Sequence, residues 1–239
     1  MQSNAMYSLS FLAKKRGWEF EYYCRINENL LKNPTGNLKA ALKNRMVLKD
    51  ISLWPYTPPK ELDVLSTLLI EKERMVVPEG GRFKEAAFGI KRLADEIIGW
   101  AETSGVNPTV VLPSGTGTTA LFLQKFLPFR VKTVACVKGE EYLKRQFFAL
   151  EKDERHHPQI LVPSKKFTFA KPYKELLHIY NRLKEESGIE FELIYDTVAF
   201  FTLLEKKEIK KDMLYIHQGG IVGNESMLQR YKAKFGKIS

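Results

Sequence analysis

The stretch that most constrains the fold of this chain is LPSGTGTTA, residues 112–120. It follows the apolar run 109–112 and precedes the apolar residues 121–123. The pattern therefore predicts a strand, a glycine-rich turn and a helix in direct succession. Gly115 and Gly117 allow the backbone to turn tightly and to approach a ligand closely, because neither has a Cβ atom.

The same stretch predicts an anion site. A helix that begins behind the turn offers unpaired N–H groups and the positive end of its dipole. Thr116, Thr118 and Thr119 add hydroxyl donors. A Walker loop carries a lysine that this stretch lacks, so a nucleoside triphosphate is not the expected ligand. A single phosphate monoester fits better, and an ordinary strand-to-helix turn remains the alternative.

Composition limits the classes of protein to consider. With 239 residues, 44% hydrophobic and 28% charged, the chain resembles soluble globular proteins of one large or two small domains. No apolar run reaches membrane-spanning length, and the first residues do not resemble a signal peptide. The two cysteines, Cys24 and Cys136, lie in apolar runs and are expected to be reduced core residues. We therefore expect a cytoplasmic protein that does not bind membranes.

The net charge of +10 raises the question of nucleic acid. The basic residues are spread along the chain and often stand beside acids, as in residues 151–155. No long Lys/Arg block or aromatic-interleaved RNA motif is present, so a solvated basic surface is expected instead. His156 and His157 are adjacent and lack ligands at metal-binding spacing, so we expect no metal site.

Short apolar segments alternate with amphipathic ones along the chain. Expected strands are 18–24, 46–48, 75–78, 109–112, 131–137, 160–162, 191–195 and 213–216. Expected helices include one capped by Ser3 or Asn4 and ending at Gly17, then 60–74, 83–105, 140–150, 173–186 and 198–206, with another beginning at 38. This alternation predicts an α/β fold with parallel sheets.

Glycine-containing or polar turns follow four of the expected strands directly, at 80–81, 114–119, 196–197 and 218–220. Ligands of parallel α/β sheets bind at the carboxyl ends of the strands. We therefore expect these turns to converge on one site.

Six short motifs occur in a characteristic order: Gln2-Ser3-Asn4, Thr35-Gly36-Asn37, Pro78-Glu79-Gly80-Gly81, Gly115-Thr116-Gly117-Thr118-Thr119, Tyr195-Asp196 and His217-Gln218-Gly219-Gly220. Their order and spacing resemble the 1-aminocyclopropane-1-carboxylate deaminase / D-cysteine desulfhydrase family over essentially the whole chain. These are pyridoxal-phosphate (PLP) enzymes of the tryptophan-synthase β fold. The resemblance implies two parallel-sheet α/β lobes of this type II PLP fold, N-terminally truncated. The smaller lobe would span 1–77 and the larger lobe, with the phosphate loop, 78–239.

The resemblance also implies roles for particular residues. The cofactor phosphate would bind at Gly115, Thr116, Gly117, Thr118 and Thr119. Ser3 matches a serine that contacts the substrate carboxylate and is proposed as the catalytic nucleophile, and Asn4 matches an asparagine beside the cofactor ring. Gly80 and Gly81 match residues that line the substrate pocket. Ser3 as a simple helix cap, and the glycines as simple turns, remain alternatives.

Two departures from the family bear on activity. The family attaches its cofactor to a lysine in a Gly-Asn-Lys stretch upstream of the Ser-Asn pair. None of the lysines here lies in such a stretch, so we expect a truncated product or a misassigned start. The family also has a tyrosine and a polar partner for the pyridine nitrogen where Ala199 and Phe200 stand here.

The resemblance implies a PLP-dependent deaminase or desulfhydrase. Such an enzyme releases ammonia and a 2-oxo acid from a small amino acid, 1-aminocyclopropane-1-carboxylate or D-cysteine. Because of the two departures, we expect weak or absent activity in this chain. The alternative is a non-catalytic protein that binds a phosphorylated small molecule through Gly115 to Thr119. We expect a homodimer and no nucleic-acid partner.

Overall fold

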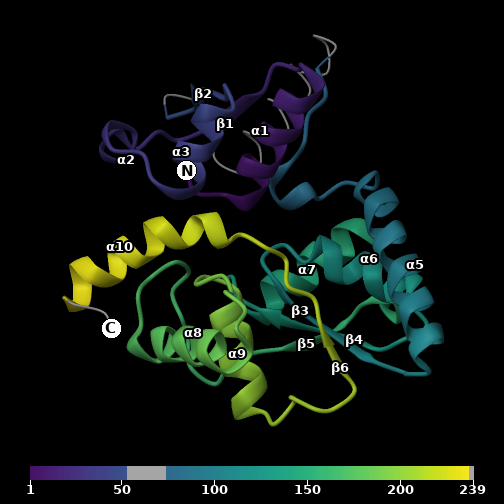
Figure 1. The fold of residues 1–239 in the computed structure, drawn as a ribbon. Helices are drawn as coiled ribbons and strands as arrows, with labels where there is room; N and C mark the ends of the chain where they lie inside the picture. The colour runs from purple at the N-terminus through teal and green to yellow at the C-terminus, as the bar shows by residue number, and fades with distance from the viewer. Residues whose placement is uncertain (53–73, 237–239) are drawn as a thin grey trace. The chain divides into compact units, whose positions relative to one another are not determined.

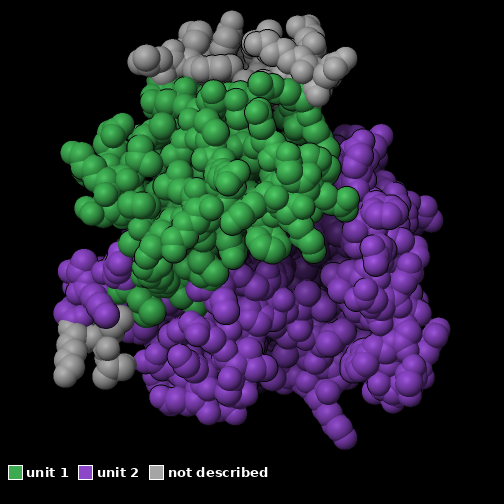
Figure 2. Space-filling view, turned by 45° about the horizontal axis from the view of Figure 1, so that its top comes forward, with its two compact units in different colours: residues 1–79, 222–228 green, residues 80–221, 229–239 purple. Residues whose placement is uncertain are grey.

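The computed structural model describes residues 1–52 and 74–236. Most of the expected helix 60–74 lies outside the described residues. The chain divides into two compact units, coloured separately in Figure 2. One comprises Met1–Glu79 and Val222–Leu228, and the other comprises Gly80–Ile221 and Gln229–Ser239. All strand pairs of the two described sheets are parallel, which confirms the predicted fold class.

The first unit is a small α/β structure. Its elements are α1 (Asn4–Arg16), β1 (Glu21–Cys24), α2 (Glu28–Lys32), α3 (Gly36–Lys43) and β2 (Val47–Asp50). Ser3 caps α1, and Gly17 ends it in the left-handed conformation, as the sequence predicts. Strands β1 and β2 pair in parallel. The core of the unit is formed by Met6, Leu38, Ala41 and Met46.

The second unit contains a four-stranded parallel sheet in the order β5-β4-β3-β6. Its strands are β3 (Thr109–Ser114), β4 (Val131–Ala135), β5 (Gln159–Leu161) and β6 (Met213–Tyr215). Its helices are α5 (Ala86–Ser104), α6 (Thr118–Phe126), α7 (Glu140–Leu150), α8 (Lys174–Ser187) and α9 (Asp196–Glu205). Helix α10 (Asn224–Phe235) begins in the first unit and ends in the second. Helices α5 and α6 cover one face of the sheet, and α8 and α9 cover the other (Figure 1).

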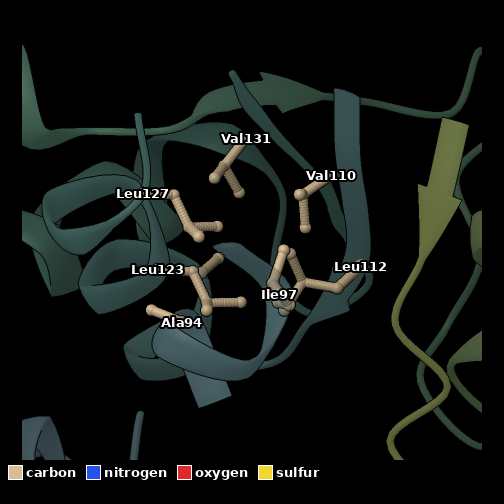
Figure 3. Packing of buried hydrophobic residues seen from close by; sticks show 8 residues of the cluster. Ala94, Ile97, Val110, Leu112, Leu123, Leu127 and Val131 are labelled. Carbon is tan, nitrogen blue, oxygen red and sulfur yellow. The ribbon is translucent and has the colours of Figure 1, made fainter. Parts of the chain in front are cut away.

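Strand β3 is buried on both faces. Val110 and Leu112 pack with Ile97 of α5 and Leu123 of α6, as Figure 3 shows. Val111, which points to the opposite face, packs with residues of α8 and α9. A strand covered on both faces needs a continuous apolar run, which is the pattern that singled out residues 109–112. Within residues 1–52 and 74–236, no helix is long and apolar enough to cross a bilayer.

Two of the predicted strands are absent from the structure. Residues 75–78 form no strand, because three apolar residues are followed by Pro78, which has no N–H for a ladder. Residues 191–195 form a turn that leads into α9. The Glu192 carboxylate accepts the N–H groups of Ile194 and Tyr195 at 2.8 and 2.6 Å. These side-chain bonds occupy donors that a strand would pair.

Candidate functional site

The predicted phosphate loop lies between β3 and α6. Gly117 precedes the helix with φ 78° and ψ 7°, a left-handed conformation that favours glycine. A Cβ atom built on Gly117 would stand 2.5 Å from the Phe147 ring and 2.6 Å from Leu143. Glycine is therefore required here both for backbone conformation and for packing. The first turn of α6 leaves its N–H groups without helical acceptors, which makes this turn suitable for an anion.

The turn at Gly80 contacts the phosphate loop directly. The hydroxyls of Thr116 and Thr118 donate to the Gly80 carbonyl at 3.3 and 3.1 Å. A Cβ on Gly80, whose φ is +69°, would stand 2.2 Å from Thr116 Oγ1. Only glycine therefore allows this approach. Gly81 follows with φ +60°, and its carbonyl accepts the N–H of Phe83 at 2.9 Å.

The turn after β6 lies against the end of β3. Gln218 Nε2 donates to the Pro113 carbonyl at 2.8 Å, one residue before the end of β3. The N–H of Gly219 donates to His217 Nδ1 at 3.1 Å. The turn at 80–81 thus contacts the phosphate loop, and the turn at 218–220 contacts the end of β3 that leads into it, whereas one site shared with 196–197 stays a prediction. Strand β6 ends at Tyr215, which pairs with Val111, so the turn after β6 continues along the last residues of β3.

Tyr195 adds a side chain that the sequence analysis did not assign to the site. Its hydroxyl would lie 3.2 Å from a Cβ built on Gly115, so the phenol lies against the phosphate loop. Its ring packs edge-on against Phe169, with ring centroids 5.3 Å apart. Its backbone carbonyl accepts from Cys136 Sγ at 3.7 Å, just beyond the end of β4. The sequence feature that could have identified Tyr195 is its place in the Tyr195-Asp196 motif, directly before α9.

A buried acidic pair fixes the backbone around Tyr195. Glu192 and Asp196 are 2% and 1% exposed. Asp196 accepts the Glu192 N–H at 2.9 Å and the Tyr215 hydroxyl at 2.6 Å. His217 Nδ1 lies 3.5 Å from Asp196. The pair therefore joins the start of α9 to β6 and to the turn that follows it.

Burial dominates the acid–base properties of this cluster. Desolvation raises the pKa of Glu192 to about 8, although its two backbone N–H donors act in the opposite direction. Desolvation likewise raises the pKa of Asp196, and the Tyr215 hydroxyl bond opposes this rise. The pKa of Tyr215 is raised by burial and by the neighbouring Asp196 carboxylate. These groups hold protons more tightly than they would in water.

In the first unit, Ser3 and Asn4 stand at the start of α1. Ser3 Oγ accepts the N–H of Met6 at 3.3 Å and so caps the helix. Asn4 Oδ1 accepts from Asn37 Nδ2 at 2.7 Å. The pKa of Tyr22 is raised by burial, although a hydrogen bond with Ser3 opposes this rise. The capping function expected for Ser3 is therefore present, and the serine hydroxyl also contacts a tyrosine.

Ala199 and Phe200 lie in the hydrophobic core. Ala199 is fully buried among apolar residues that include Val111 and Val134. Phe200 packs edge-on against Phe191, with ring centroids 5.1 Å apart. Neither side chain provides a polar group. The two positions at which the family has polar residues are therefore filled by apolar core packing in this chain.

The second unit is thus a parallel α/β sheet with a glycine–threonine turn between β3 and α6, the fold that the resemblance implies. Solved structures share this fold. An ACC deaminase homologue has a TM-score of 0.76 and 21% identity over 97% of this chain and 75% of its own. Diaminopropionate ammonia lyase from Escherichia coli has a TM-score of 0.61 and 15% identity, with coverage of 99% and 67%.

A third neighbour, O-ureido-L-serine synthase, has a TM-score of 0.60 and 17% identity, with coverage of 98% and 73%. No protein-family model matches the chain, and no curated protein matches it. The likenesses confirm the fold expected from the resemblance. At these identities they define the fold, while substrate and reaction must be argued from the site.

The residues of the anion loop fit the phosphate group of PLP. Two glycines keep the turn free of side chains, and the adjacent helix supplies N–H groups. Three threonine hydroxyls stand in or beside the turn, at Thr116, Thr118 and Thr119. The N–H groups at the helix start are donors that a phosphate monoester needs, and the Thr116 and Thr118 hydroxyls, which donate to the Gly80 carbonyl here, would turn to it. No carboxylate within residues 115–119 would repel the phosphate.

Proposed function

We propose that this chain binds PLP, with the cofactor phosphate held by residues 115–119. The observation that carries this proposal is the left-handed Gly117 at the start of α6, with Thr116 and Thr118 bound to the Gly80 carbonyl. The hydroxyl bonds order the threonine side chains beside the helix N-terminus. On binding, these hydroxyls would turn from the Gly80 carbonyl to the phosphate while the loop backbone stays in place, which keeps the entropic cost low.

The proposed reaction class is release of ammonia and a 2-oxo acid from a small amino acid, either 1-aminocyclopropane-1-carboxylate or D-cysteine. When bound, PLP supplies an electron sink for chemistry next to the amino group. Ser3 would contact the substrate carboxylate and act as the nucleophile, and Asn4 would lie beside the cofactor ring. Gly80 and Gly81 would line the substrate pocket.

We further propose that turnover by this 239-residue chain is weak or absent. None of its lysines lies in a Gly-Asn-Lys stretch. Ala199 and Phe200, the positions where the resemblance implies polar groups, are packed in the core. The same two facts favour the second candidate function, a non-catalytic protein that binds a phosphorylated small molecule. Both candidates use the same loop and differ in whether the bound group is a working cofactor.

A borohydride experiment separates the two candidates. We expect the purified 239-residue chain to take up PLP reversibly, without a stable covalent bond to one lysine. After incubation with PLP and reduction with borohydride, mass spectrometry should find only scattered, low-level labelling of surface lysines. Such labelling is expected because the chain contains 27 lysines, whose amines can form imines with the aldehyde.

One cofactor-sized adduct on a single lysine, with matching visible absorbance, would contradict this expectation. Release of a 2-oxo acid from D-cysteine or 1-aminocyclopropane-1-carboxylate would establish the first candidate directly. A parallel incubation with pyridoxine 5′-phosphate provides the control, because it carries the phosphate but no aldehyde to be captured by a lysine.

A further inference from the structure

Helix α5 exposes two large aromatic side chains on the face that points away from the core. Its inner face carries Ala94 and Ile97, which pack against β3 and α6. The outer face of such a helix is normally polar. Here Phe88 is 76% exposed and Trp100 is 46% exposed, and α5 lies at the outside of the second unit (Figure 1). Exposed aromatic rings on one helix face are typical of a surface that a partner covers.

The same face carries two glycines inside the helix, Gly89 and Gly99. Neither has a positive φ, so the backbone conformation does not require glycine. A Cβ atom built on either residue would meet no atom within 4 Å in the described parts of the chain. Packing within the chain therefore does not require glycine either, although glycine destabilises a helix relative to alanine. A second backbone that approaches this face closely would account for both glycines.

Two charged residues complete the outer face of α5. Arg92 and Glu96 are exposed, and neither side chain forms an ion pair or a hydrogen bond within residues 1–52 and 74–236. The neighbouring Lys91 and Asp95 pair with each other along the edge of the face. The face therefore presents one positive and one negative charge between the two rings, one helical turn apart.

The order of these residues is symmetric about Ala94. Phe88 and Trp100 are equidistant from Ala94 along the chain, and so are Arg92 and Glu96, and the two glycines. When two copies of a helix pack antiparallel about a two-fold axis, each residue faces the residue at equal distance on the other side of the centre. With the axis at the level of Ala94, Phe88 would face Trp100 of the second copy. Arg92 would likewise face Glu96, and each glycine would face the other.

We propose that two copies of this chain associate through the outer face of α5 as an antiparallel helix pair, with contacts from Phe88, Gly89, Arg92, Glu96, Gly99 and Trp100. A second copy is the partner that this face fits, because its rings, charges and glycines are complementary to themselves under one two-fold rotation. The homodimer expected from the sequence thereby has a defined contact. All of these residues belong to the second unit, and the contact does not depend on the proposed binding of PLP.

The size of the contact sets the expected affinity. Helix α5 has 19 residues and is therefore about 28 Å long. One pair of such helices buries less than the roughly 1,600 Å² of a standard protein–protein interface. We therefore expect a reversible dimer with a Kd on the order of 10 μM.

Charge reversal tests the pairing of Arg92 with Glu96. Arg92→Glu places like charges opposite each other in both halves of the contact, and Glu96→Arg does the same with the opposite sign. Each variant alone should raise the dimer Kd at least about tenfold, because facing like charges oppose association. An equimolar mixture of the two variants should form a heterodimer, since every pair then joins opposite charges. Sedimentation velocity over a concentration series measures the Kd, and native mass spectrometry identifies the heterodimer.

Lys91→Glu is the matched control for charge reversal. It changes the net charge as much as Arg92→Glu does, on the same helix. The residue at equal distance beyond Ala94 is the buried Ile97, so Lys91 faces no side chain of the second copy. The control should dimerise as the wild type does. An equal loss of affinity in Lys91→Glu, or no heterodimer in the mixture, would overturn the inference.

Gly99→Gln is a second test, in which association and stability respond differently. Glutamine favours helix more than glycine does, and its side chain would meet no atom of the described chain. The melting temperature, measured well below the dimer Kd, should therefore not fall. The added side chain would hold the two helices apart, so the dimer Kd should rise at least about tenfold. Dimerisation as tight as that of the wild type, or a wild-type chain that stays monomeric at about ten times the expected Kd, would overturn the inference.

Discussion

A Gly117→Val variant is expected to lose binding of both PLP and inorganic phosphate, with each Kd rising at least about 100-fold, as expected when several hydrogen bonds are lost together. Valine cannot adopt φ 78° without strain, and its Cβ would meet Phe147 and Leu143 at 2.5 and 2.6 Å. The turn must therefore move, and the N–H groups of α6 move with it. Titration of PLP followed by absorbance, and of phosphate by calorimetry, measures the loss.

Leu143 and Phe147, which the valine would displace, belong to a buried cluster with Leu121 and Ala135. Gly117→Val should therefore also lower the melting temperature. Thr118→Val separates binding from stability, because valine resembles threonine in shape and lacks the hydroxyl. The Thr118 hydroxyl, which donates to the Gly80 carbonyl without ligand, would turn to the phosphate on binding, so its loss should weaken phosphate binding about tenfold. If Gly117→Val remained folded and bound phosphate as tightly as the wild type, the loop would not be the site.

The free energy of unfolding is expected to fall as the pH rises from about 5 to about 8, because of Glu192. The pKa of this carboxyl is raised by burial from 4.5 to about 8 in the folded chain. Between these values the folded state holds a proton that the unfolded state has released, so rising pH favours unfolding. The stabilisation is complete below the unfolded pKa and is lost as the pH passes through the folded one. The expected loss is roughly 2–4 kcal/mol.

Glu192→Gln should remove this part of the pH dependence, because its amide oxygen can still accept the N–H groups of Ile194 and Tyr195. The variant should be more stable than the wild type at pH 8.5 to about the same extent, as measured by urea unfolding at several pH values. Asp196 contributes a slope of the same sign that persists in the variant. Glu186→Gln, an exposed change in α8, is the control and should keep the wild-type slope. Identical slopes for wild type and Glu192→Gln would contradict the burial argument.

Local signals in the sequence determined much of the fold and the candidate phosphate site. Ser3 at the start of α1 and the glycines at 17 and 105 are recognisable because capping depends on a few neighbouring residues. The phosphate loop is recognisable for the same reason, since a glycine turn between an apolar strand and a helix is a local pattern. The order of the six motifs then indicated the type II PLP fold, which the solved structures confirm.

Tertiary structure decided what depends on residues far apart in sequence. Residues 191–195 have the composition of a strand, yet the Glu192 and Asp196 carboxylates bind backbone donors there and produce a turn. The contacts of Tyr195 with Gly115, and of Asn37 with Asn4, join segments separated by many residues and leave no local pattern. Apolar periodicity and capping are properties of a short stretch, so the sequence reveals them. Which polar groups meet in the folded chain depends on how the elements pack, so only the structure shows it.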